Sequence, residues 1–364
     1  MTSTKRIAIL HDALVVTAGS EKVALHLSNV FPDAPLYTSA YLPENTFPEF
    51  KGRRIITLPF ASLAKSERQF KGLFPLWYIG FSRLDLSAYD LVISSANYLA
   101  KFINPPPHTR HICYLHNPFR FLWKRNAYSD LSLPYGKLAL RAIDLLLPFL
   151  RKVDVSKTRK IDHIVANSRN ISNQIKRIYG MESDVIYPPV PVRQFLTASD
   201  TGDYYLYAGR LISHKRVDIA IKAFNQLNRR LIIAGDGLER PALEKLAGST
   251  ITFTGRVSDQ QLKQLYARCK ALIFPSDEDF GLIPVEVQAS GRPVIAYQAG
   301  GALETVVESE TGLFFPEQTA ESLCEAVLKF ERMKFNPERI RENALRFDES
   351  VFEEKIRQLV DQFN

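Results

Sequence analysis

Short apolar runs alternate with helix-like stretches along most of the chain, and this alternation constrains the fold more than any other feature of the sequence. The runs are rich in β-branched and aromatic residues, and they lie at 6–10, 91–94, 112–115 and 164–166, then at 204–208, 231–234, 250–253, 271–274 and 293–296. Such runs are typical of parallel strands that helices cover on both faces. We therefore predict an α/β fold of two doubly wound, Rossmann-like domains in tandem that face a cleft.

The two series of strands indicate two domains, because a chain of 364 residues exceeds the size at which one hydrophobic core stops growing. The proline-rich segment 187–191 and the polar segment 197–202 predict a linker between them. We place the first domain at 1–192 and the second at 197–345. A C-terminal helix at about 349–364 is expected to pack back on the first domain.

Charge is divided unevenly between the two halves. The chain has 47 Lys and Arg residues against 39 Asp and Glu residues, a net charge of +8. Residues 1–195 hold 26 basic and 14 acidic residues, whereas residues 196–364 hold 21 and 25. A basic first half indicates an anionic partner such as nucleic acid, a membrane surface or a phosphorylated substrate, although a solvated basic face without a partner has the same composition.

Two stretches of the first half, 51–83 and 138–160, combine basic residues with large apolar ones. This combination suits attachment to an anionic lipid surface, and the alternative is core helices with a solvated basic side. No apolar run approaches 18 residues, and the start of the chain does not resemble a signal peptide. We therefore expect a cytoplasmic protein that associates peripherally with the inner face of the membrane.

The segment 275–286 carries the most informative motif. It follows a predicted strand, contains Glu278, and reaches Gly281, where a helix that includes Glu286 is expected to begin. Backbone N–H groups at a helix start form an anion site, and glycine permits close approach of a phosphate. Glycosidases also use paired carboxylates. The helix start nevertheless favours a nucleotide sugar as the ligand.

Metal binding is the alternative for this segment, because Asp277 and Asp279 have D-x-D spacing. We favour the metal-free interpretation and expect no cofactor. The cysteines are too far apart to predict a zinc site or a disulfide framework, and we expect three reduced thiols, Cys113, Cys269 and Cys324.

A second motif places Arg210 and Lys215 after the first strand of the second half. Two cations five residues apart at one strand end can converge on one diphosphate, with arginine as a bidentate fork and lysine as a point charge. The motif gains specificity from the acidic pair that follows in the same α/β series.

With these motifs the chain resembles the family 4 retaining glycosyltransferases, which have the GT-B fold. The resemblance covers nearly the whole chain and includes the segments 235–237, 253–257 and 300–304. Within the family, three further segments resemble the GDP-mannose-dependent mannosyltransferases that build lipopolysaccharide, O-antigen and exopolysaccharide, namely 116–123, 166–168 and 187–190.

The resemblance implies a role for each matching residue. Arg210 and Lys215 would stabilise the leaving diphosphate, Glu278 would bind sugar hydroxyls, and Glu286 would accept hydrogen bonds from the ribose. His116 would face the sugar from the first domain, and its alternative is a structural histidine. The remaining donor-binding positions are Gly19, Arg256 and Val257 (against the base), and Phe280, Gly281, Leu282 and Ile283 at the helix start.

Two positions depart from the family pattern. Ala18 stands where the first glycine of a G-G-x-E loop is usual, in a segment 18–21 that we interpret as a turn. A methyl group disfavours positive φ, so we expect this loop to wrap phosphates less closely. Pro191 stands where Asp often follows the Y-P-P-V run, so a polar contact near the linker is expected to be absent.

The function implied by the resemblance is transfer of a hexose, with mannose from GDP-mannose expected, to a lipid-linked or lipopolysaccharide or exopolysaccharide glycan. Retention would proceed by front-face displacement in which the leaving phosphate takes the acceptor's proton. The first domain would bind the acceptor and the second the nucleotide sugar. Three alternatives stay open: a GT-B transferase that uses a UDP-sugar, a UDP-sugar 2-epimerase, and a non-catalytic nucleic-acid binder. We expect no nucleic-acid partner, because a binder of that kind has no use for the Glu278 and Glu286 pair.

Overall fold

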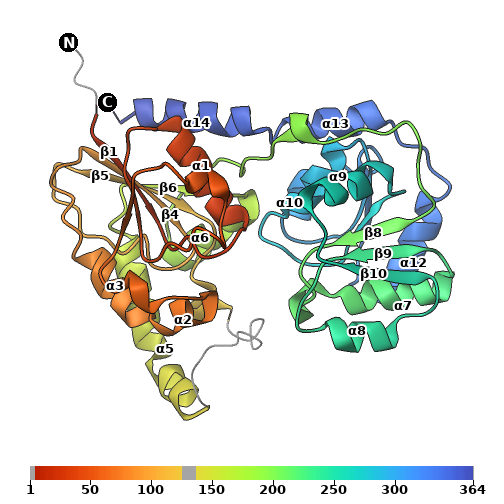
Figure 1. The fold of residues 1–364 in the computed structure, drawn as a ribbon, viewed down its shortest axis with the longest axis horizontal. Coiled ribbons are helices and arrows are strands. Elements are labelled where there is room, and N and C mark those ends of the chain that lie inside the picture. The colour runs from red at the N-terminus through yellow and green to blue at the C-terminus, as the bar shows by residue number, and fades with distance from the viewer. Residues whose placement is uncertain (1–4, 125–136, 364) are drawn as a thin grey trace. The chain divides into compact units, whose positions relative to one another are not determined.

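The computed structural model describes residues 5–124 and 137–363, apart from the side chains of Arg68 and of residues 137–142. The chain forms two units (Figure 1). Unit 1 comprises Met1–Pro189 together with Phe352–Asn364, and unit 2 comprises Val190–Val351.

Unit 1 is built on a seven-stranded parallel sheet with the order β3-β2-β1-β4-β5-β6-β7. Its strands are β1 (Ile7–His11), β2 (Leu36–Thr38), β3 (Ile55–Thr57), β4 (Leu91–Ala96), β5 (Arg110–Leu115), β6 (His163–Ala166) and β7 (Asp184–Val185). Its helices are α1 (Gly19–Val30), α2 (Glu67–Gly72), α3 (Phe74–Ser82), α4 (Arg120–Trp123), α5 (Lys137–Thr158), α6 (Arg169–Tyr179) and α14 (Glu349–Asp361), with short 3₁₀ turns at Pro48–Phe50 and Ala61–Leu63.

Helices cover both faces of this sheet, as its strands show residue by residue. On β1, Ala8 and Leu10 belong to the core that includes residues of α3 and α6, whereas Ile9 belongs to the core that includes residues of α1 and α14. Successive side chains of a strand point to opposite faces, so both faces must be apolar when both are covered. Phe352 and Ile356, one turn apart on α14, are buried in the second of these cores.

Unit 2 has a six-stranded parallel sheet with the order β10-β9-β8-β11-β12-β13. Its strands are β8 (Tyr205–Ala208), β9 (Leu231–Ala234), β10 (Ile251–Gly255), β11 (Leu272–Phe274), β12 (Val294–Tyr297) and β13 (Gly312–Phe315). Its helices are α7 (Val217–Leu227), α8 (Arg240–Leu246), α9 (Asp259–Arg268), α10 (Leu282–Ala289), α11 (Ala302–Thr305), α12 (Ala320–Phe330) and α13 (Pro337–Leu345), with 3₁₀ turns at Val192–Gln194 and Ser213–Lys215.

Both sheets follow the Rossmann order, in which the first strand lies at the centre and the chain then builds outward on each side. The predicted pair of Rossmann-like α/β domains is therefore confirmed. Helix α9 begins at a reciprocal capping box that Ser258 and Gln261 form. Strands β2, β3, β7 and β13 were not among the predicted runs.

The basic and aromatic stretch 51–83 packs differently from its expected role at a lipid surface. Phe70, Trp77 and Phe81 are buried in the core of unit 1, and the indole N–H of Trp77 donates to the carbonyl of Phe70 at 2.9 Å. These three rings are therefore unavailable to lipid, which corrects the expectation for them. Phe60 stays exposed. The side chain of Arg68 lies outside those described.

Candidate functional site

Two charged residues of unit 2, Lys215 and Glu278, meet where its strand order reverses, beyond the carboxyl ends of β8 and β11. The Nζ of Lys215, in the loop after β8, lies 2.5 Å from Oε1 of Glu278, in the loop after β11. The hydroxyl of Ser276 donates to the same carboxylate oxygen at 3.0 Å. Ligands of doubly wound sheets bind at such a switch point. The fold thus brings together two residues that the sequence assigned to different parts of one donor.

Arg210 occupies the same loop as Lys215, and its side chain is exposed. Its carbonyl accepts a hydrogen bond from the hydroxyl of Tyr207 at 3.2 Å. Burial raises the pKa of Tyr207, the negative charge of Glu278 raises it further, and the positive charge of Arg210 opposes both. Tyr207 is therefore a neutral donor that ties the loop to the end of β8. Sequence reasoning missed it, because a tyrosine within a strand reads as a core residue.

Glycines let the loops around this point approach one another closely. Gly235 has φ of 141°, and a Cβ there would lie 1.8 Å from the carbonyl oxygen of Gly209. Gly301 donates its backbone N–H to the carbonyl of Glu278 at 2.8 Å, and a Cβ at Gly301 would lie 2.1 Å from the carbonyl oxygen of Phe280. The segment that carries Glu278 is therefore held by backbone contacts that only glycine permits.

The start of α10 follows the prediction for Gly281. This residue is the N-cap with φ of 83°, and the helix runs from Leu282. Ile283 packs toward the first loop, since its Cδ1 lies 3.6 Å from the position of a Cβ on Gly209. Phe280 is buried, with its ring centroid 5.6 Å from that of Phe347. The backbone N–H groups of this first turn lack intrahelical acceptors, which is the arrangement that binds anions at other helix starts.

Glu286 lies on α10, where its Oε2 accepts a hydrogen bond from the hydroxyl of Tyr266 at 3.1 Å. Tyr266 is buried on α9, and its pKa is raised first by burial and then by the charge of Glu286. A neutral phenol thus orients this carboxylate. Arg256 and Val257 follow β10 and line a shallow groove of about 550 Å³ with Gln261. Within the described residues, no group of three or more His, Cys, Asp or Glu side chains is placed to hold a metal ion.

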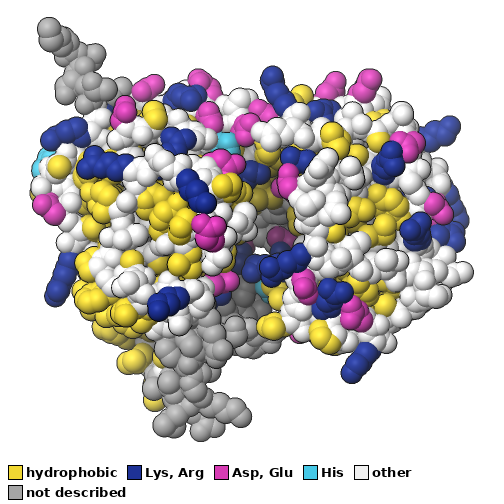
Figure 2. Space-filling view, viewed as in Figure 1, with side chains coloured by type: hydrophobic (Ala, Val, Ile, Leu, Met, Phe, Trp, Pro, Cys, Tyr) yellow, Lys and Arg dark blue, Asp and Glu magenta, His cyan; other side chains and the backbone are white. Residues whose placement is uncertain are grey.

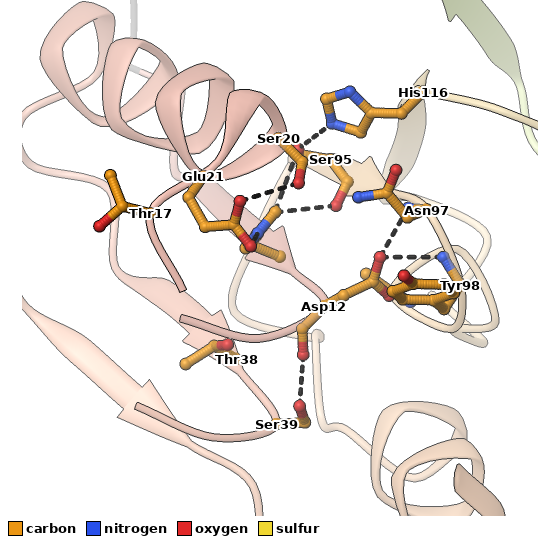
Figure 3. Close-up of polar contacts among 12 residues, drawn as sticks. Asp12, Thr17, Ser20, Glu21, Thr38, Ser39, Ser95, Asn97, Tyr98 and His116 are labelled. Atoms are coloured by element: carbon orange, nitrogen blue, oxygen red, sulfur yellow. Dashed lines mark hydrogen bonds and ion pairs between the residues drawn. The ribbon is translucent and has the colours of Figure 1, made fainter. Parts of the chain in front are cut away.

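His116 follows β5 in unit 1 and lies in a separate, buried cluster (Figure 3). Its Nε2 lies 2.8 Å from the hydroxyl oxygen of Ser95, and its backbone N–H donates to the carbonyl of Ala96 at 3.0 Å. Burial, aided by the nearby charges of His11 and Arg120, lowers the pKa of His116 to about 3. The imidazole is therefore neutral at physiological pH. Burial and the bond to Ser95 fit both a catalytic and a structural histidine.

The cluster continues from Ser95 to His11 and Glu21. His11 Nδ1 lies 3.1 Å from both the hydroxyl and the carbonyl oxygen of Ser95, and its Nε2 lies 3.8 Å from Oε1 of Glu21. The hydroxyl of Ser20 donates to the other oxygen of Glu21 at 3.0 Å. His11 and Ser95 are register partners of the parallel strands β1 and β4. Sequence reasoning missed both, although a histidine at a strand end was a visible signal.

Asp12 anchors the loop after β4. Its carboxylate accepts four backbone hydrogen bonds, from Asn97, Tyr98, Leu99 and Ala100, at 2.6 to 2.9 Å. Because a buried carboxylate requires such partners, this contact fixes the loop relative to β1.

Gly19 begins α1, so the segment 18–21 is a helix start, and its interpretation as a turn was wrong. Ala18 is the N-cap with φ of −148° and ψ of 179°, an extended conformation open to any residue. Ala18 does not require positive φ, so the reason given for a looser phosphate loop does not apply, and the closeness of the loop to phosphates stays a prediction.

The similarity in sequence to a known protein family lies in unit 2. Residues 192–347 match the family described as glycosyl transferases group 1. The O-antigen chain mannosyltransferase RfbU of Salmonella typhimurium is 27% identical over 202 residues, which cover 50% of this chain and 56% of that protein. The alpha-D-kanosaminyltransferase of Streptomyces kanamyceticus is 32% identical over 153 residues, which cover 38% and 39%. The matches thus span about half or less of these relatives.

Likeness of fold extends over nearly the whole chain. The crystal structure of HepE from Anabaena in complex with UDP-glucose superposes with a TM-score of 0.70 at 18% identity and covers 99% of this chain and 100% of HepE. Together with the two Rossmann-ordered sheets, this likeness confirms the expected GT-B fold class.

Proposed function

From a chain whose residues 192–347 match the group 1 glycosyltransferases, we propose a retaining glycosyltransferase that transfers a hexose from a nucleotide sugar to a glycan. The observation that carries this proposal is the meeting of Lys215, Glu278 and the start of α10 at the switch point of unit 2. A cation and a helix start bind a diphosphate, and a carboxylate binds sugar hydroxyls.

In this proposal Lys215 and Arg210 neutralise the charge that develops on the leaving diphosphate, which is the costly part of breaking the bond from sugar to phosphate. The contact of 2.5 Å with Glu278 keeps Lys215 aimed at that position. Glu286, oriented by Tyr266, accepts hydrogen bonds from the ribose. The acceptor hydroxyl bonds to the anomeric carbon on the face from which the phosphate leaves, so retention needs no enzymic nucleophile. The leaving phosphate takes the proton of that hydroxyl, so the step needs no enzymic base.

His116 acts here as a neutral hydrogen-bond donor toward the transferred sugar, and its tautomer follows from the cluster around it. A carbonyl oxygen only accepts, so the contact with the carbonyl of Ser95 assigns a proton to Nδ1 of His11. The Ser95 hydroxyl is then free to donate to Nε2 of His116. His116 consequently carries its proton on Nδ1. Ser95 and His11 are positioning residues in this scheme.

The proposed donor is GDP-mannose and the proposed acceptor is a lipid-linked or cell-surface glycan at the inner face of the membrane. The resemblance of the segments 116–123, 166–168 and 187–190 to mannosyltransferases supports this choice, as does the likeness to the O-antigen chain mannosyltransferase RfbU. A UDP-sugar is the second candidate donor, which the likeness to the HepE complex with UDP-glucose favours. Metal-independent transfer is part of the proposal.

Calorimetric titration with GDP-mannose, UDP-glucose, an ADP-sugar and a dTDP-sugar, each with and without EDTA, tests these choices. We expect GDP-mannose to bind tightest and EDTA to leave its affinity unchanged. Tighter binding of UDP-glucose would replace the donor while keeping the reaction. Absence of binding by all four would overturn the proposed function.

A further inference from the structure

Helix α5 of unit 1 has two faces of opposite character over its described side chains. Its inner face packs on the sheet, where Asp154 and Thr158 are buried and Leu150 lies against the core. Asp154 is paired with the buried Lys101 at 2.7 Å, so its charge is satisfied inside the unit. Packing and the buried ion pair attach α5 to unit 1 through its inner face, and neither of them involves the outer face.

The outer face presents large apolar side chains to solvent. Leu145 is 84% exposed, Leu146 53% and Phe149 63%. Leu145 and Phe149 are four residues apart and therefore lie on one stripe of the helix. Figure 1 shows α5 extending beyond the rest of unit 1, and Figure 2 shows hydrophobic side chains gathered on the same unit over α3. Such an exposed apolar group marks an interaction surface.

Cations follow this apolar group along the same stripe. Lys152 lies three residues beyond Phe149, and it lines a groove of about 540 Å³ with Arg151, Arg159 and Trp123. The guanidinium of Arg151 lies 5.4 Å from the Trp123 ring centroid. Residues 143–160 hold five Lys and Arg residues, and their one acid besides the buried Asp154 is Asp144. The outer face is thus apolar at one end and cationic at the other.

We propose that this outer face of α5 docks on an anionic lipid bilayer, with Leu145, Leu146 and Phe149 entering the acyl region and Lys152 and its neighbours meeting lipid phosphates. An amphipathic helix with an apolar insertion and a basic flank binds an interface in this way. Charge complementarity selects lipid over a second copy of the chain, because two such faces would bring like charges together. No helix of the described residues is both long and apolar enough to cross a bilayer.

Lipid docking adds a membrane-binding surface to the proposed function, and its biological role depends on that function. A lipid-linked acceptor is confined to the membrane surface, and docking through α5 would hold unit 1 there. Of the two stretches that the sequence suggested for lipid contact, the inference keeps 138–160, most of which forms α5. It leaves out the three rings of the stretch 51–83 that are core residues, Phe70, Trp77 and Phe81.

Co-sedimentation with vesicles tests the apolar part. The variant combines Leu145→Ser, Leu146→Ser and Phe149→Ser, and the control combines Leu196→Ser, Leu328→Ser and Leu345→Ser, which removes three exposed leucines from unit 2. On vesicles of phosphatidylglycerol and phosphatidylcholine we expect the face variant to lose at least roughly tenfold in partitioning while the control matches wild type. Thermal unfolding monitors the fold of each protein.

A double variant, Lys152→Glu with Lys160→Glu, tests the charged part. Its control is Lys222→Glu with Lys245→Glu, which makes an equal change of charge at exposed lysines of unit 2. We expect the first pair to weaken binding by roughly tenfold or more at low salt, to have little effect at high salt, and to have none on pure phosphatidylcholine. Equal pelleting of wild type and the face variant would overturn the proposal.

Two further outcomes are decisive. A wild type that fails to pellet but is dimeric by sedimentation equilibrium, with a monomeric face variant, would make this face a contact between copies and overturn lipid docking. The proposed function is judged separately by nucleotide-sugar binding in the same preparations. Vesicle binding without binding of any nucleotide sugar would sustain the docking surface and overturn the transferase.

Discussion

Two groups of polar residues, one in each unit, are stabilised in different ways, one by burial without charge and the other by an ion pair. The cluster around His116 in unit 1 is buried and joined by short bonds through Ser95, and burial keeps its imidazole uncharged. The group around Lys215 in unit 2 is a partly exposed ion pair with Glu278 on loops that glycines bring together. Desolvation thus keeps the His116 imidazole neutral, whereas the Lys215 ammonium keeps its charge beside a carboxylate that is itself within reach of water.

The largest effect is expected at the charged group. Lys215→Ala and Arg210→Ala should each lower sugar transfer by at least roughly 10²-fold, the scale for loss of one preorganised group that stabilises developing charge. Initial rates with the donor found by titration measure this. Lys222→Ala, an exposed lysine of α7, is the control. Near-normal turnover by a folded Lys215→Ala protein would remove Lys215 from the mechanism.

The neutral group predicts a dependence of stability on pH. The pKa of His116 falls from 6.5 in the unfolded chain to about 3 in the folded one, so the unfolded chain binds the proton more tightly. Stability from this group is complete above pH 6.5 and is lost progressively as pH falls toward 3. Between pH 6.5 and 5 the loss is about 2 kcal/mol for one such group.

Urea unfolding at pH 7 and pH 5 measures that loss in wild type and in His116→Asn, which should lose less over this interval. His108→Asn, at an exposed histidine, is the control and should behave as wild type. Identical losses in all three proteins would mean that His116 is not held neutral by burial.

A smaller effect is expected from Ser95→Ala. Removing the hydroxyl leaves Nε2 of His116 without its hydrogen-bond donor, so the imidazole proton is no longer fixed on Nδ1. This loss should lower transfer by roughly tenfold. Ser94→Ala is a closely matched control, because Ser94 is a buried serine of the same strand whose hydroxyl lies 2.8 Å from His111 Nε2. Nitrogen NMR of His116 should report Nδ1–H in wild type and a mixture in Ser95→Ala. An Nε2–H signal in wild type would contradict the assignment.

The smallest effect is expected from chelation. Transfer should survive EDTA, since in the proposed mechanism Lys215, Arg210 and the start of α10 stabilise the diphosphate without a cation. Activity that disappears with EDTA and returns with Mg²⁺ or Mn²⁺ would instead favour the D-x-D interpretation of Asp277 and Asp279.

Local patterns predicted the parts of the fold that local physics controls. The central strands β1, β4 and β8 each contain three or four consecutive apolar residues, as expected for strands that helices cover on both faces. Strands β2, β3 and β7 escaped prediction because each has only two or three residues and one of them is polar. Strand β13 is as long as β8 but begins with Gly312, a residue type that is depleted in strands. A short strand near a sheet edge is stabilised by its neighbour rather than by its own composition.

By itself, the sequence determined the alternation of strands and helices, the start of α10 after Gly281, and the two cations after β8, because each depends on residues close together in the chain. Only the tertiary structure decided that His11 lies beside Ser95, since the parallel register of β1 and β4 joins residues far apart in sequence. It likewise decided that Lys215 pairs with Glu278, and that Trp77 turns inward while Phe149 turns outward. Composition does not encode which face of a helix meets the sheet, because burial is fixed only when the elements pack.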